Sequence, residues 1–374
     1  MADAEAEPAT PPWWRRLVDT LKVPVLATFS ALVLGGVVIM FTHEDGASLS
    51  IVVEAYTALF QGALGSPAAI SETLLRATPL ILAGLAVGFA FKAALFNIGA
   101  NGQMIMGAIA AAWAGFTLDI PGPLALVVAM LCGVLGGAIW GGIAGVLKAT
   151  TGAHEVITTI MLNFIATFFV AYVLTTRTFL PGDAGNPVSK KMLEQARLPR
   201  FIDGERVDAG ILIALAAVFL VWWLLERSTF GFQVKAVGLN PDAARYAGMN
   251  VALITALTMA IAGGLAGLGG GTIVIGPTGV LTAGAIGTLG FDAIAVALLG
   301  RSNPLGILAA GLLFGGLNAG AVRMQVETQI PVDIVIVIQA LIILFVAAPA
   351  LVRAIYRIKA EPTDTPTFTS SWGG

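Results

Sequence analysis

Long apolar runs alternate with short polar segments along most of this sequence. Several runs approach the roughly 20 residues that a helix needs to cross a bilayer, and others are shorter. The runs lack the short alternating strands of a membrane β-barrel. The pattern therefore predicts an all-α fold, a polytopic transmembrane helical bundle of about ten spans, some of them short or broken. The expected spans are 24–42, 73–92, 103–118, 122–147, 155–176, 209–226, 251–268, 286–300, 304–322 and 332–352.

The composition agrees with this class. Hydrophobic residues make up 57% of the chain and charged residues 11%, whereas a soluble domain has about 25% charged residues. Cys132 is the one cysteine and lies in an apolar run, so a disulfide framework is excluded. Since the chain has two histidines, His43 and His154, we expect no histidine-based metal site. We also expect no cofactor.

The distribution of basic residues predicts an orientation. An even number of spans places both chain ends on one side, and basic residues flank the first and last spans. We therefore expect cytoplasmic tails at 1–23 and 353–374 around a transmembrane domain at 24–352. The loop at 227–250 is then cytoplasmic and the loop at 177–208 extracellular. Cytoplasmic loops of membrane proteins are usually the ones enriched in lysine and arginine. The expected extracellular loop is an exception, because it contains Arg177, Lys190, Lys191, Arg197, Arg200 and Arg206.

Glycine recurs at every fourth position in two of the expected spans. This spacing places the glycines of each span on one helix face, where a neighbouring backbone can approach closely. The pattern predicts tight helix packing rather than chemistry. The repeats are Gly133, Gly137, Gly141 and Gly145 in one span and Gly263, Gly267 and Gly271 in the other.

A cluster of uncharged amides interrupts the apolar sequence at "LFNIGANGQMIMG", residues 95–107. Asn97, Asn101 and Gln103 stand there with glycines, which are poor helix formers. One interpretation is a break between two half-helices, whose polar groups face a water-filled transport path. The other is a cytoplasmic turn between spans. The spacing of the residues does not decide between them.

Two further polar positions lie inside apolar segments. Asp292 lies in "TLGFDAIAVALLG", residues 288–300. It is either a functional carboxylate within the membrane or a residue that caps a short helix. Asn163 follows Glu155 by eight residues, about two helical turns, so the two lie on a similar face. Glu155 itself is expected at the membrane edge.

The loop at 227–250 specifies a short helix between two spans. Asn240 is a good N-cap, Pro241 fits the first helical position and Gly248 is a good C-terminal stop. A short cytoplasmic helix at about 241–247 suits docking in a groove of another protein. We expect Ala244 and Arg245 to lie where that partner makes contact.

Four motifs in one order resemble a known family. "GFQVKAVGLNPDAARYAGMNV" resembles the coupling-helix segment of ABC-importer permeases of the ribose and branched-chain amino acid type. Three other motifs are similar to the larger permease subunit of bacterial nucleoside ABC importers. They are "LFNIGANGQMIMG", "HEVITTIMLNFIA" and "GFDAIAVALLGRSNPLGI". The resemblance covers about residues 70–350.

The resemblance implies a transport subunit with no catalytic residue, in the bacterial inner membrane. Its implied partners are a second related permease, an ABC ATPase with two nucleotide-binding domains and an extracellular substrate-binding lipoprotein. The chain has no G-x-x-x-x-G-K-[ST] phosphate loop, so ATP hydrolysis is expected in the partner. No nucleic-acid partner is expected. The implied substrate path is lined by Phe96, Asn97, Asn101, Gln103, Asn163, Phe291 and Asp292, and the implied coupling residues are Asn240, Pro241, Ala244, Arg245 and Gly248.

The implied substrate is a nucleoside. Amides donate and accept hydrogen bonds with ribose and base, and an aromatic ring stacks on a base. A simple sugar suits the same residues nearly as well. An ion-coupled secondary transporter would need paired charges within the membrane, where the chain offers chiefly Asp292. A membrane anchor without transport activity would need no polar residues within its spans.

Overall fold

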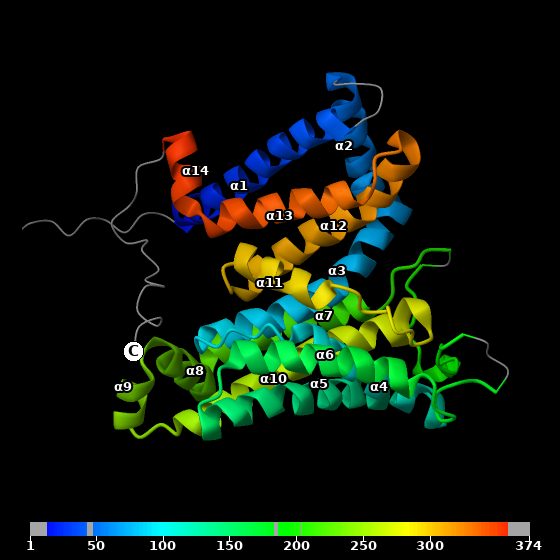
Figure 1. The fold of residues 1–374 in the computed structure, drawn as a ribbon, viewed down its shortest axis with the longest axis vertical. Helices are drawn as coiled ribbons and strands as arrows, with labels where there is room; N and C mark the ends of the chain where they lie inside the picture. The colour runs from blue at the N-terminus through cyan, green and yellow to red at the C-terminus, as the bar shows by residue number, and fades with distance from the viewer. Residues whose placement is uncertain (1–12, 43–47, 183–185, 203, 358–374) are drawn as a thin grey trace, which may run out of the picture. The chain divides into compact units, whose positions relative to one another are not determined.

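The computed structural model describes residues 13–42, 48–182, 186–202 and 204–357, which form two compact units. The first unit contains the two ends of the chain, 1–49 and 333–374. In it α1 (Trp13–Thr42) packs against α13 (Asp333–Ala347) and α14 (Pro349–Tyr356) (Figure 1). The buried hydroxyl of Ser30 lies 2.9 Å from the hydroxyl of Tyr356, which ties α1 to α14.

The second unit, residues 50–332, contains the expected transport and coupling residues. Its centre is α10, which contacts α3, α4 and α5, while α11 and α12 pack against α3. Its helices are α2 (Leu49–Leu64), α3 (Pro67–Lys92), α4 (Ala100–Thr117), α5 (Pro123–Thr151), α6 (Glu155–Val173), the 3₁₀ turn η1 (Glu194–Ala196), α7 (Gly210–Arg227), α8 (Thr229–Leu239), α9 (Pro241–Tyr246), α10 (Val251–Ile273), the π-helical segment η2 (Val274–Thr278), α11 (Leu289–Leu299) and α12 (Pro304–Thr328).

The predicted close packing at the glycine repeats is confirmed, and the structure shows that the two repeats pack against each other, between α5 and α10. A Cβ atom at Gly137 would lie 2.2 Å from the backbone oxygen of Gly263. Likewise, a Cβ at Gly267 would lie 2.4 Å from the backbone oxygen of Gly133. The two backbones therefore touch directly, and any side chain at these positions would push the helices apart.

The helical class is confirmed, whereas the number of spans is not. Each of the ten expected spans contains a helix. In the described residues, six helices are long and apolar enough to cross a membrane. The segment expected at 286–300 forms only the 11-residue α11, which is about 16 Å long at 1.5 Å per residue. The structure also adds α2, which the sequence analysis did not predict because Glu54 and Gln61 interrupt its apolar run.

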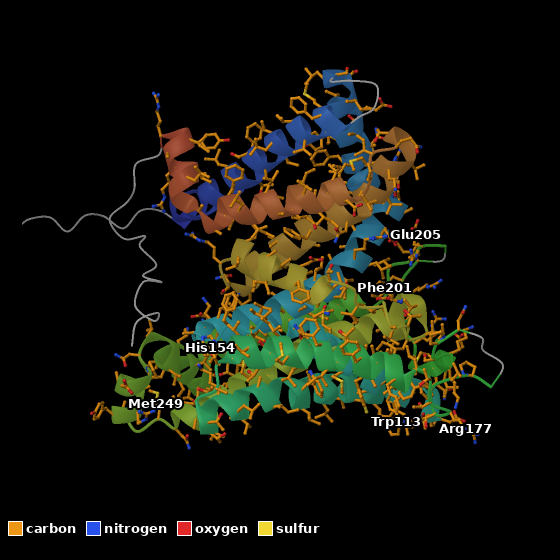
Figure 2. The ribbon with its side chains drawn as sticks, viewed as in Figure 1. Trp113, His154, Arg177, Phe201, Glu205 and Met249 are labelled. Atoms are coloured by element: carbon orange, nitrogen blue, oxygen red, sulfur yellow. The ribbon has the colours of Figure 1, made fainter. Side chains whose placement is uncertain are left out.

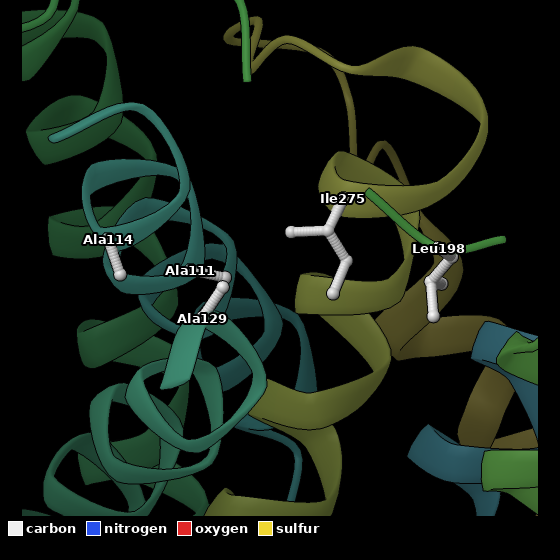
Figure 3. Packing of buried hydrophobic residues seen from close by; sticks show 5 residues of the cluster. All are labelled: Ala111, Ala114, Ala129, Leu198 and Ile275. Atoms are coloured by element: carbon white, nitrogen blue, oxygen red, sulfur yellow. The ribbon is translucent and has the colours of Figure 1, made fainter. Parts of the chain in front are cut away.

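Within the second unit, residues 186–202 pack against the chain that follows α10. They pair with the irregular stretch after α10 through an isolated bridge between Val188 and Thr282 and a hydrogen bond from Leu198 N–H to Ile275 O of 2.9 Å. Leu198 and Ile275 belong to a buried cluster with the alanines Ala111, Ala114 and Ala129 of α4 and α5 (Figure 3).

The loop expected outside the cell and the loop expected in the cytoplasm lie at opposite ends of the second unit. Figure 2 shows Arg177, Phe201 and Glu205 at one end and His154 and Met249 at the other, next to α8 and α9. This separation agrees with the expectation that the loops at 177–208 and 227–250 face opposite sides.

Candidate functional site

The break predicted in the amide-rich stretch lies between α3 and α4, at residues 93–99. Within it Asn97 and Gln103 pair through both ends of their amides. Asn97 Nδ2 donates to Gln103 Oε1 at 3.0 Å, and Gln103 Nε2 donates to Asn97 Oδ1 at 3.1 Å. Asn97 Oδ1 also accepts the Gly99 N–H at 3.0 Å, and the two amide side chains are 1% exposed. The pair therefore closes the turn onto the first helical residues of α4.

Asn163 joins α6 to the same turn. Its Oδ1 accepts the N–H of Gly102 at 2.8 Å, and its Nδ2 donates to the carbonyl of Ile98 at 2.9 Å. As predicted, Asn163 shares the buried face of α6 with Glu155. Gly102 also adjoins Trp140, whose Nε1 is a buried N–H without a hydrogen-bond partner among the described residues.

Asn101 joins the start of α4 to the start of α11. Its Oδ1 accepts the N–H of Gly290 at 3.2 Å. A Cβ at Gly290 would lie 2.2 Å from the backbone nitrogen of Asn101, so the two helix starts meet backbone to backbone. The side chain of Asn101 thus satisfies one of the free N–H groups at the N-terminus of α11.

These bonds bear on the interpretation in which the amides face a water-filled transport path. Buried amides without partners are costly, and water in such a path would be one source of partners. The chain itself provides partners for these side chains: Asn97 and Gln103 bond each other, Asn97 accepts the Gly99 N–H and Asn101 accepts the Gly290 N–H. The need for hydrogen bonds therefore does not by itself require a cavity, and the transport-path interpretation stays a prediction.

The remaining residues of the expected path are more accessible. The side chains of Phe96 and Phe291 are 42% and 44% exposed. The ring of Phe96 stacks on that of Phe91, with centroids 5.1 Å apart. Asp292 is half-buried in the first turn of α11, and its backbone N–H donates to the carbonyl of Thr288 at 3.1 Å. This position agrees with the helix-start interpretation, since a carboxylate in the first turn is favourable there.

Glu155 is the first residue of α6 and is buried against the protein, with its side chain only 9% exposed. Its expected place at the membrane edge stays a prediction. Glu155 accepts a hydrogen bond from Lys148 Nζ at 2.6 Å and a long one from the Phe96 N–H at 3.5 Å. The sequence places Lys148 seven residues before Glu155, but this spacing alone does not predict an ion pair. The turn at Gly152, with φ +71°, brings the two side chains together.

The short helix predicted in the loop at 227–250 is confirmed as α9. Asn240 Oδ1 accepts the Ala243 N–H at 2.9 Å, and Pro241 is the first helical residue. The helix ends as expected at Gly248, which has φ +83° and donates its N–H to the Arg245 carbonyl at 3.0 Å. Both ends are thus fixed by local sequence.

The expected exposure of Ala244 is wrong. Its side chain is 4% exposed, since α9 packs against α8 and α10. The exposed face presents Tyr246, which is 94% exposed, and Arg245, which pairs with Asp242 at 3.1 Å. Leu239, at the end of α8, is 88% exposed. A six-residue helix is too short for periodicity to identify its buried side.

Comparison with known proteins identifies the family. Residues 69–347 match the family described as "Branched-chain amino acid transport system / permease component". The chain belongs to this permease family. Its members in this comparison include a guanosine ABC transporter permease protein of Bacillus subtilis, which is 38% identical over 89% of this chain and 94% of its own length.

Two other permease relatives have comparable similarity. A glucose ABC transporter permease protein of Haloferax volcanii is 37% identical over 86% of each chain. A nucleoside ABC transporter permease protein of Lactococcus lactis is 36% identical over 88% of this chain and 92% of its own length. Bacillus subtilis and Lactococcus lactis each have a second matching permease, at 28% and 26% identity. No solved structure matches the chain significantly.

Membership of this family, together with the long apolar helices, makes the chain a multi-pass membrane protein with a transport role rather than a catalytic one. The resemblance noted from four sequence motifs is thereby confirmed. The occurrence of paired permease relatives in two bacteria agrees with an ABC system that has a second permease subunit.

Proposed function

We propose that this chain is the permease subunit of an ABC importer that carries a nucleoside across the inner membrane of a bacterium. The observation that carries the proposal is the similarity, over most of the chain, to guanosine and nucleoside permeases at 36–38% identity. A simple sugar is the second candidate, because a glucose permease is 37% identical.

The substrate path is proposed to run along the accessible side of the α4 and α11 starts. Phe96 and Phe291 offer ring faces for a base, and Asp292 offers hydrogen-bond acceptors for ribose hydroxyls. The buried amides of Asn97, Asn101, Gln103 and Asn163 form the wall behind these residues and position them. The bonds of the amides to the backbone of 98–102 and to Gly290 support this division of roles.

The partner ATPase is proposed to dock on α9 and the end of α8. Asn240, Pro241 and Gly248 fix the shape of this segment, and Tyr246, Leu239 and Arg245 provide its exposed surface. Tyr246 is suited to be the anchor, since buried aromatic residues contribute much of the energy of an interface. Tyr246→Ala should reduce co-purification of the ATPase, whereas Glu194→Ala, whose side chain is 80% exposed at the opposite end of the unit, should not.

The proposed assembly has a second related permease and an extracellular lipoprotein that delivers the substrate. The transmembrane domain is proposed at 24–352, with about ten spans and cytoplasmic ends. Sidedness is testable with cysteines at exposed positions in a Cys132→Ala background. Lys191→Cys should react with an impermeant reagent from outside and Ala243→Cys only from inside. Reaction of both from one side would overturn this topology.

The substrate is tested by uptake in cells that express the whole transport system. Labelled guanosine should accumulate, and unlabelled nucleosides should compete while glucose does not. Competition by glucose and not by nucleosides would favour the sugar permease. Uptake that persists without ATP and collapses with the ion gradient would contradict the ABC mechanism.

A further inference from the structure

The last turn of α3 touches α8 through the backbone. A Cβ at Gly238 of α8 would lie 2.3 Å from the carbonyl oxygen of Lys92 and 2.9 Å from the Cα of Ala93. No flexible side chain lies between the two backbones at this contact. A displacement of α8 therefore acts directly on the residues that follow α3.

The turn at 93–99 is held in one conformation. The N–H groups of Ala94 and Leu95 donate to the carbonyls of Phe91 and Ala90 at 3.0 and 3.1 Å, which closes the end of α3. Ala94 adopts a left-handed conformation with φ +53°, which fixes the direction in which the chain leaves the helix. The ring of Phe96, in the turn, stacks on the ring of Phe91, in the last turn of α3.

The far end of the turn is bonded to α4 and α6, and the start of α4 is itself bonded to α11. The pair of Asn97 with Gln103 joins it to α4, and Asn163 joins it to α6. Asn101, at the beginning of α4, bonds the first turn of α11 through Gly290. Backbone contacts and buried amide bonds therefore connect α8, α3, α4 and α11 without interruption.

We propose that the turn at 93–99 is a rigid relay that carries the movement of α8 and α9 to the starts of α4 and α11. Well-packed interiors are poorly compressible and transmit displacement, and here each link is backbone or a hydrogen-bonded amide. Gly238 and Asn101 are positioning residues, since they act through the helices that they join. The inference rests on the proposed docking of an ATPase on α9.

The test uses the complete transporter, with its ATPase and second permease, reconstituted in vesicles. Gly238→Ala and Gly238→Val force α8 away from Lys92 by increasing amounts. The matched control is Gly142→Ala, because a Cβ there meets only Ala260 at 3.6 Å, an ordinary contact. ATPase co-purification, basal ATP hydrolysis and nucleoside-stimulated ATP hydrolysis are measured for each.

The relay predicts that both Gly238 variants assemble with the ATPase and hydrolyse ATP at the basal rate. Their maximal nucleoside-stimulated rate should fall at least fivefold, more for valine than for alanine, while the nucleoside concentration for half-maximal stimulation changes less than twofold. The Gly142→Ala control should keep full stimulation. Full stimulation in assembled Gly238 variants would overturn the relay.

A second variant covers the case in which a Gly238 variant does not assemble. Asn101→Ala removes the bond to Gly290 at the other end of the relay, away from α8. It should keep the ATPase bound and lower the maximal stimulated rate in the same way. Normal stimulation in Asn101→Ala would contradict the relay. Failure of the unsubstituted chain to bind an ATPase would instead refute the proposed docking.

Discussion

The amide pair of Asn97 and Gln103 allows a quantitative prediction. Gln103→Met keeps the length of the side chain and removes its amide. Asn97 Nδ2 then loses its acceptor at a position that is 1% exposed, while Asn97 Oδ1 keeps the Gly99 N–H. One buried N–H without a partner costs about 1–3 kcal/mol, which is the expected loss in the free energy of unfolding.

A double variant tests whether Asn97 and Gln103 stabilise the chain as a pair or independently of each other. Asn97→Leu leaves the Gln103 amide and the Gly99 N–H without their partners, so its cost is the larger one. In the double variant, with Asn97→Leu and Gln103→Met, only the Gly99 N–H remains unpaired. The unpaired N–H groups of Asn97 Nδ2 and Gln103 Nε2 occur in the single variants and are both absent from the double variant. At about 1–3 kcal/mol each, the double variant should therefore cost about 2–6 kcal/mol less than the sum of the single variants.

The assay is unfolding of the purified chain in detergent, followed by tryptophan fluorescence, with uptake measured on the same variants. Gln195→Met is the matched control, because its amide bonds Asp119 on an exposed surface and should matter by less than about 0.5 kcal/mol. Unchanged stability of Gln103→Met together with lost uptake would refute the reasoning. That result would mean that the amide faces the substrate rather than Asn97.

Three further predictions concern packing, pH and backbone strain, each measured by thermal unfolding. Gly137→Ala should destabilise the chain strongly, since its Cβ would lie 2.2 Å from a backbone oxygen, whereas Gly142→Ala should not; equal melting temperatures would contradict the close contact. Burial raises the pKa of Asp208 above 3.8 against the attraction of Arg200, so stability should decline as the pH rises from 3.8 through the folded pKa. Asp208→Asn should flatten that pH dependence, and an unchanged profile would count against it. Ala94→Gly should stabilise the chain by about 1 kcal/mol, because Ala94 has φ +53° and glycine adopts this left-handed conformation without strain; an unchanged melting temperature would contradict this.

Local sequence predicted those features that depend on neighbours along the chain. The caps of α9 at Asn240 and Gly248 were predictable because each cap bonds within three residues of itself. The apolar runs predicted the helices, and the repeats at Gly137 and Gly263 predicted a close contact, since periodicity assigns residues to a helix face. The interruption of the helix before α4 was predictable from its glycines, although its place in or outside the membrane was not.

Features that depend on distant residues were not predictable. The partner of Asn101 is a backbone N–H 189 residues away, and the partners of Asn163 lie more than 60 residues before it. The burial of Ala244 depends on how α9 lies on α8 and α10. For the same reason the sequence pattern left two interpretations of the amides open.

The central claim is that this permease supports uptake that is powered by a separate ATPase. The most direct measurement is ATP hydrolysis by the complete complex in vesicles, with and without a nucleoside at the extracellular side together with its binding lipoprotein. The account predicts that ATPase subunits co-purify with this chain and that nucleoside raises their rate of hydrolysis while nucleoside enters the vesicles. Nucleoside uptake without ATP hydrolysis, or hydrolysis that nucleoside does not change, would contradict it.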